Sequence, residues 1–206
     1  MRILPVTAII GTILFIFLAT VLGSPELNAL DDAIGNVFYN GPAWLIAACK
    51  TLAWFGGAFG SLLLAAVIGA GLWFKLGDRR NSIGLVLAIF SGWLLNAALK
   101  FSILRPRPTL EFLASAHGPS FPSGHAMSAW IMSFVLALIA THYQPQRRTL
   151  WFSLAFCAAI FGGLARLVLG VHHFSDIIAG FSVASAIVYL YSYAASRITP
   201  LDRLQP

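Results

Sequence analysis

The stretch Ile83-Gly-Leu-Val-Leu-Ala-Ile-Phe-Ser-Gly-Trp-Leu-Leu-Asn-Ala-Ala-Leu99 decides the fold class of this chain. It contains no charged residue and comes close to the roughly 20 residues that a helix needs to cross about 30 Å of hydrocarbon. A backbone surrounded by hydrocarbon must satisfy its own hydrogen bonds, so the stretch is predicted to be a transmembrane helix. Five further apolar stretches predict the same structure, at residues 4–22, 57–74, 127–140, 150–169 and 177–193.

The composition excludes a disordered chain and argues against a soluble one. Hydrophobic residues make up 59% of the 206 residues and charged residues only 10%, whereas soluble domains carry about 25% charged residues. A chain of this length cannot bury so much apolar surface in water. Residues 4–22 also resemble a cleaved signal peptide, but their apolar run exceeds the roughly 7–15 residues of a signal core. We therefore predict an all-α polytopic membrane protein with six transmembrane helices, forming a single domain over residues 1–206.

The net charge of +6 is distributed in a way that predicts orientation. The basic residues are too scattered for a nucleic-acid site, so no nucleic-acid partner is expected. With six spans, eight basic residues fall on one side, namely Arg2, Lys75, Arg79, Arg80, Arg147, Arg148, Arg197 and Arg203. The positive-inside rule assigns that side to the cytoplasm. We predict a plasma-membrane protein with both termini in the cytoplasm and with residues 24–56, 100–126 and 170–176 on the outer side.

Residues 24–56 are predicted to form an amphipathic helix on the outer membrane surface. Apolar residues recur there mostly at three- and four-residue steps. Asp31 and Asp32 fall between them and are predicted to be a solvated face. The two cysteines, Cys49 and Cys157, are predicted to be buried spacers, since their number and spacing fit neither a disulfide framework nor a zinc site.

Ionisable residues gather in three clusters on the predicted outer side, and such residues at a membrane are functional by default. The first cluster is Lys100, Arg105 and Arg107, with Pro106 and Pro108 between and after the arginines. Arginine offers a planar fork to phosphate or carboxylate, and lysine a mobile point charge. Taken alone, this cluster also fits an anchor for lipid headgroups.

The second cluster is Pro122-Ser-Gly-His125. Ser123 is a good N-cap, Gly124 lets the backbone approach a ligand closely, and the start of a helix offers free N–H groups to an anion. Capping explains Ser123 and Gly124 but not His125, which lies in the first turn, where it can donate a proton.

The third cluster is Arg166, His172 and Asp176. Asp176 follows His172 by one helical turn, so the two side chains share a face if the last span begins near His172. An aspartate on one ring nitrogen leaves the other nitrogen free to attack. His173 points about 100° away and is predicted to be an interfacial aromatic residue. The three clusters together suit phosphoryl transfer, in which positioning and charge neutralisation do most of the work.

In these residues the chain resembles the type 2 phosphatidic acid phosphatase superfamily, including its bacterial undecaprenyl-diphosphatase and phosphatidylglycerophosphatase B-like members. Three family motifs, K-x6-RP, PSGH and SR-x5-H-x3-D, match in register at Lys100–Pro108, Pro122–His125 and Ala165–Asp176. The resemblance covers about residues 57–193. One departure is Ala165, where the family has serine, which removes a hydroxyl from the edge of the site.

The resemblance implies a role for each position. His172 would attack phosphorus and form a phosphohistidine, Asp176 would orient and charge-stabilise it, and His125 would protonate the leaving oxygen and then activate water. The phosphoryl oxygens would be held by Lys100, Arg107, Ser123, Gly124 and Arg166. Arg105 would be an extra cation for a second phosphate or a headgroup. The resemblance implies neither a metal nor a cofactor.

We therefore expect an integral membrane lipid phosphatase that takes its substrate from the bilayer. The resemblance implies undecaprenyl diphosphate, phosphatidylglycerol phosphate or phosphatidate, and Arg105 places a polyprenyl diphosphate slightly ahead. Two other functions fit the same residues: a lipid phosphotransferase that passes the phosphoryl group to an alcohol, and a non-catalytic membrane transporter. The oligomeric state stays open.

Overall fold

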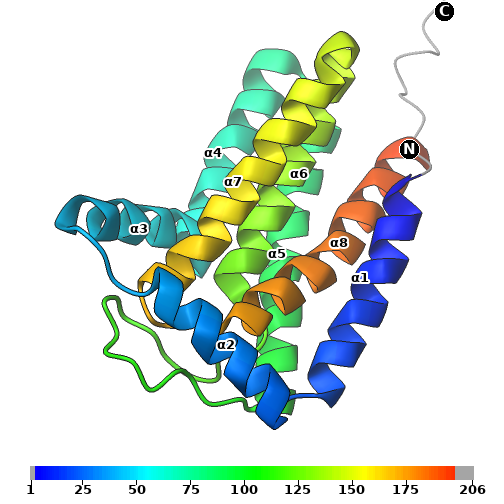
Figure 1. Cartoon of the computed structure of the whole chain (residues 1–206). Helices are drawn as coiled ribbons and strands as arrows, with labels where there is room; N and C mark the ends of the chain where they lie inside the picture. Colours follow the sequence, from blue (N-terminus) through cyan, green and yellow to red (C-terminus); the bar gives the residue numbers. More distant parts are fainter. Residues whose placement is uncertain (1–2, 198–206) are drawn as a thin grey trace, which may run out of the picture.

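Figure 1 shows the computed structural model of the chain, which describes residues 3–197. Regular structure within these residues is entirely helical, which confirms the all-α prediction. The helices are α1 (Ile3–Thr20), α2 (Pro25–Phe38), α3 (Ala43–Gly56), α4 (Ala58–Leu76), α5 (Arg79–Ile103), α6 (Gly124–Tyr143), the short 3₁₀ helix η1 (Pro145–Arg147), α7 (Arg148–Val168) and α8 (Phe174–Arg197). Two of the bases used above to predict orientation, Arg2 and Arg203, lie outside the described residues.

Five helical segments are long and apolar enough to cross a membrane, namely α4, α5, α6, α7 together with η1, and α8. The sixth candidate span is the pair α1 and α2, which passes the same test with a bend of 108° between its helices. The six apolar stretches of the sequence therefore each coincide with a helix of the bundle. Large side chains such as Phe74, Leu94 and Phe101 stay exposed on the outside, as expected of a surface that meets lipid.

The core of the bundle forms where α5, α6 and α8 pack together. Leu85 and Ile89 of α5 meet Met127 and Ile131 of α6 and Ala184 of α8 in one buried cluster. In lipid there is no hydrophobic driving force between helices, so helix association depends on van der Waals packing. Small residues are therefore expected where two helices come closest.

Gly163 of α7 is one such contact. A Cβ atom at this position would lie 2.6 Å from the Phe181 ring and 2.7 Å from Cγ2 of Ile177, both on α8. A glycine at this position therefore allows α7 and α8 to approach closely.

The segment after the first span is two helices rather than the single amphipathic helix expected. α2 lies across the lower end of the bundle in Figure 1, and α3 runs out to its side. The break falls at Asn40 and Gly41, whose φ angles are 69° and 144°, and Pro42 is the N-cap of α3. A continuous helix is prevented here because proline has no N–H to donate and its ring clashes with the preceding turn.

The prediction that Asp31 faces solvent is wrong. Asp31 is 2% exposed, while its neighbour Asp32 is exposed as expected. The reason is its place on α2, one helical turn after the buried Leu27 and therefore on the inward face.

The cysteines differ from one another. Cys49 is buried as predicted, but Cys157 is exposed. Cys157 shares the outward face of α7 with the exposed Leu154 and Phe161, at helical spacings of three and four residues.

We expect Gly163→Ala to lower the thermal stability of the protein in detergent, by about 1–3 kcal/mol, because Phe181 or Ile177 must move to admit the methyl group. Gly71→Ala in α4 is the matched control, since a Cβ atom there meets nothing within 4 Å. Thermal unfolding of both variants measures the difference. Equal melting temperatures for the two variants would contradict close packing at Gly163.

Candidate active site

The three polar clusters of the sequence meet at one end of the bundle, where α2 and the loop of residues 104–123 also lie (Figure 1). Lys100 is in the last turn of α5, and Arg166 is in the last turn of α7. Ser123 is the N-cap of α6, and its backbone N–H donates to the Asp176 carbonyl at 2.9 Å. That bond joins the start of α6 to the start of α8 and so brings the second and third clusters together.

His172 and Asp176 form a buried pair. Nδ1 of His172 lies 3.2 Å from Oδ2 of Asp176, and the two residues are 4% and 0% exposed. Because α8 begins at Phe174, the contact does not come from a shared helical face as expected. It comes from the turn before the helix, where Oδ2 also accepts the His173 backbone N–H at 2.9 Å.

The pair leaves one nitrogen of His172 free for chemistry. A carboxylate can only accept, so Nδ1 carries the proton and Nε2 keeps its lone pair. Burial lowers the pKa of His172 to about 3, because the charged ring loses its water, and the nearby Asp176 acts in the opposite direction. The imidazole is therefore neutral at physiological pH, as a nucleophile must be.

Arg107 lies beside this free nitrogen, with Nη1 3.4 Å from Nε2 of His172. Its guanidinium is held by backbone carbonyls: Nη1 donates to Val171 at 2.6 Å, Nε to Gly118 at 2.9 Å and Nη2 to His117 at 2.9 Å. Fixed in this way, the arginine is positioned to bind whatever anion reaches the imidazole.

Two further cations complete the pocket. Nζ of Lys100 donates to the carbonyls of Pro119 and Ser120. Arg166 is 2% exposed, and its Nε has no hydrogen-bond partner. Among residues 3–197, neither these cations nor Arg107 has a carboxylate within 4.0 Å. Buried positive charge without a partner is costly, so the arrangement favours an anionic ligand.

His125 lies at the start of α6, within electrostatic reach of Arg166, His172 and Lys100. Its ring packs edge-on against Trp93, with ring centres 6.1 Å apart. The predicted second histidine thus lies near the first one, on a different helix.

Ser123 and Gly124 build the start of α6. Ser123 is fully buried, and its Oγ accepts the Ala126 N–H at 3.4 Å, which confirms the predicted cap. At Gly124 a Cβ atom would come within 2.6 Å of Asn96 and 2.7 Å of Trp93, so only glycine fits. The first N–H groups of a helix have no intrahelical partner, so the start of α6 can offer them to an anion.

The structure corrects the expectation for Arg105. This residue is 8% exposed and points into the protein: Nη1 donates to Asp176 Oδ1 and Ser175 Oγ, both at 2.7 Å, and Nη2 donates to Asp31 Oδ2 at 2.8 Å. Because its positive charge is paired with these two carboxylates, Arg105 is not free to hold a second phosphate. Asp31 is the residue that the sequence motifs missed, although its spacing from Leu27 and Ile34 already placed it on the apolar face of its helix.

Two further residues, Ala165 and His117, lie at the margin of the site. The Ala165 side chain packs with Cys49, Val168 and Leu169 in a buried cluster, so the family hydroxyl is replaced by apolar packing. The ring of His117 is exposed, and only its carbonyl takes part in holding Arg107.

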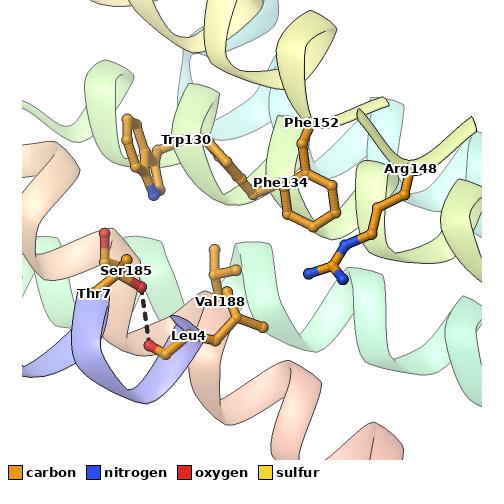
Figure 2. Close-up of a pocket in the computed structure, with 8 residues that line it drawn as sticks. All are labelled: Leu4, Thr7, Trp130, Phe134, Arg148, Phe152, Ser185 and Val188. Carbon is orange, nitrogen blue, oxygen red and sulfur yellow. Dashed lines mark hydrogen bonds between the residues drawn. The ribbon is translucent and has the colours of Figure 1, made fainter. Parts of the chain in front are cut away.

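A separate cavity of about 210 Å³ lies away from this chemistry, between α1, α6, α7 and α8. Figure 2 shows its aromatic walls, Trp130, Phe134 and Phe152, with Arg148 at one side. None of the predicted site residues lines it. The candidate active site is therefore identified by its charges and hydrogen bonds rather than by its volume.

Comparison with known proteins decides the family. Residues 81–200 match the family model of the PAP2 superfamily, and this range holds all three motifs. The chain belongs to the PAP2 superfamily. It is 31% identical over 183 residues to phosphatidylglycerophosphatase B of Bacillus subtilis, and the aligned region covers 85% of this chain and 88% of that protein. It is 32% identical over 190 residues to a lipid A 1-phosphatase of Rhizobium etli, covering 82% and 75%.

Solved structures agree with this PAP2 membership. The crystal structure of a transmembrane PAP2 type phosphatidylglycerolphosphate phosphatase from Bacillus subtilis matches with a TM-score of 0.88 and 26% identity, covering 95% of this chain and 98% of that one. The fold is also found in Aquifex aeolicus LpxE, with a TM-score of 0.61 and 23% identity over 80% and 95% of the two chains. The chain is thus a multi-span PAP2 membrane protein.

We expect His172 of this PAP2 protein to stay a neutral imidazole, protonated on Nδ1, as the pH falls from about 8 to about 5. An unperturbed histidine, with a pKa of about 6.5, becomes charged over the same range. Nitrogen-15 NMR of histidine-labelled protein measures this directly, and His172→Gln assigns the resonance. Protonation of His172 near the ordinary pKa would contradict its burial.

Proposed function

We propose that this PAP2 protein hydrolyses the phosphate ester of a membrane lipid through a phosphohistidine formed on His172. The membrane lipid phosphatase class follows from the family and from relatives that are named lipid phosphatases. The observation that carries the mechanism is the neutral, buried His172–Asp176 pair, whose free nitrogen faces Arg107, a cation without a carboxylate partner among residues 3–197.

In the first step, Nε2 of His172 attacks phosphorus and the bond from phosphorus to the lipid oxygen breaks. His125 donates a proton to that leaving oxygen, which departs as the lipid alcohol. The imidazole gains a positive charge, which Asp176 balances across the Nδ1 hydrogen bond. Lys100, Arg107 and Arg166 neutralise the phosphoryl oxygens together with Ser123 and the Gly124 amide.

In the second step, water replaces the histidine. His125, now neutral, takes a proton from the water as its oxygen attacks phosphorus, and the phosphorus–nitrogen bond breaks. Inorganic phosphate leaves, and His172 returns to its neutral form. No step needs a metal, and among residues 3–197 no group of three or more His, Cys, Asp or Glu side chains is placed to hold one.

A lipid monophosphate such as phosphatidylglycerol phosphate is the substrate that we now favour. The relatives with 31% sequence identity and with a TM-score of 0.88 carry that activity in their names. The sequence argument for a polyprenyl diphosphate rested on Arg105 as a free cation, and Arg105 is occupied by Asp31 and Asp176.

We also propose that the site faces the outer side of the membrane. The opposite end of the bundle carries a set of basic residues near the helix ends, among them Lys75, Arg79, Arg147 and Arg148, and the positive-inside rule makes that end cytoplasmic. α3 bears exposed Trp44, which suits the level of lipid headgroups.

We expect His172→Ala to abolish phosphate release, because it removes the attacking nitrogen, and His125→Ala to reduce kcat on the order of 10²–10⁴-fold, as for loss of a general acid. His117→Ala is the matched control, since its exposed ring makes no contact with Arg107 and its carbonyl is retained. The assay uses purified protein in detergent with phosphatidylglycerol phosphate, phosphatidate and undecaprenyl diphosphate, with and without EDTA.

Full activity of His172→Ala, or loss of activity in EDTA that a divalent metal restores, would overturn this mechanism. A labelled alcohol that gains phosphate faster than water does would identify a phosphotransferase instead.

For orientation, we expect a cysteine placed at Thr109 to react with a membrane-impermeant maleimide in intact cells, and one at Gln146 to react only after lysis. Both positions are exposed, one beside the site and one between α6 and α7. The background is Cys49→Ala with Cys157→Ala. The reverse labelling pattern would place the site in the cytoplasm.

A further inference from the structure

Behind the proposed nucleophile lies a second, fully buried charge cluster. It consists of Asp31, Arg105, Ser175 and Asp176, which are 2%, 8%, 2% and 0% exposed. Asp31 Oδ2 accepts from Arg105 Nη2 at 2.8 Å and from Ser175 Oγ at 2.6 Å. Arg105 Nη1 in turn donates to Asp176 Oδ1 at 2.7 Å, on the side of the carboxylate that does not face His172.

Asp31 also fixes the start of α8. Its Oδ1 accepts the Ser175 backbone N–H at 2.7 Å, one of the N–H groups that the first turn of a helix leaves unpaired. A carboxylate at this place also complements the positive end of the helix dipole. Asp31 of α2 therefore acts as a cap for the helix turn that carries Asp176.

The contact between Asp31 and Arg105 also affects the net charge of the buried cluster. Arg105 alone would cancel the single negative charge of Asp176. The reaction requires that charge, because His172 becomes positive when it attacks, and a buried positive charge without a partner is costly. With Asp31 included, two carboxylates surround one guanidinium, and one net negative charge is left for His172.

We propose that Asp31 is a positioning residue of the reaction, which neutralises Arg105 so that Asp176 keeps its charge for the phosphohistidine. This inference rests on the proposed function. Asp31 lies outside residues 81–200, which match the family model, and acts on His172 only through Arg105 and Asp176.

The test compares Asp31→Asn with Asp32→Asn in the full-length protein, with phosphatidylglycerol phosphate as substrate. Asp32 is the next residue of the same helix and is exposed, so its change removes the same charge from the surface. We expect Asp31→Asn to lower kcat by about 10–100-fold, the usual effect of losing a partner that orients a reacting group. KM should stay unchanged, because the phosphate-binding cations are not altered, and Asp32→Asn should behave as wild type.

A second variant separates charge balance from simple loss of structure. Asp31→Asn combined with Arg105→Gln removes both charges and returns the cluster to the single negative charge of Asp176. We expect this double variant to regain about tenfold in kcat over Asp31→Asn, since residues in one network couple strongly. If the cluster were only structural, removing a further buried bond would lower kcat again. This comparison stands even if Asp31→Asn alone does not fold, because a folded but inactive double variant would overturn the proposal.

The outcomes also separate this inference from the proposed function. Activity in His172→Ala would remove the phosphohistidine mechanism itself. Equal kcat values for Asp31→Asn and Asp32→Asn, in a protein that depends on His172, would overturn only the role of Asp31, as would a rise in KM without a loss of kcat.

Discussion

The rest of the site depends on one constraint. Three cations are held at one end of an apolar bundle, and none has a carboxylate partner in the described part of the chain. Such charges are costly in a medium of low dielectric constant. Backbone carbonyls of residues 117–120 and Val171 offset part of that cost for Lys100 and Arg107. This explains why the connection between α5 and α6 is a long irregular loop: a helix would use these carbonyls for its own hydrogen bonds.

The sequence was sufficient for the membrane-spanning helices and for the residues that gather at one end of the bundle. Apolar runs predicted the spans, and three short motifs predicted the residues that meet at one end. It was insufficient where contacts join distant segments, as between Asp31 and Arg105, which are 74 positions apart. Both residues were interpreted from their neighbours alone, as a solvated aspartate and a free cation. Their pairing is visible only once α2 lies beneath α8.

Two of the helices that precede the family-matched region, α2 and α3, each pack against one histidine's part of the site. α2 supports His172 indirectly, since Asp31 caps α8 and neutralises Arg105. α3 contacts His125 directly, since a Cβ atom at Gly56, its last residue, would lie 3.4 Å from Cδ2 of the imidazole. A further bond from Ser128 Oγ to the Gly56 carbonyl, at 2.6 Å, ties that end of α3 to α6. The segment that was expected to be an amphipathic helix on the membrane surface thus also contributes to the framework of the site.

The two histidines also differ in their access to water, and the chemistry needs that difference. His172 is 4% exposed, so the charge that it would gain in the proposed attack has to be balanced by the protein, and Asp176 and the cluster behind it are placed to do so. His125 is only partly buried, at the end of the bundle where α3 and α6 meet. The two tasks proposed for His125, protonating a lipid oxygen and then deprotonating water, both need access to water. The proposed mechanism therefore uses a buried nucleophile and a more exposed acid–base group at the same end of the bundle.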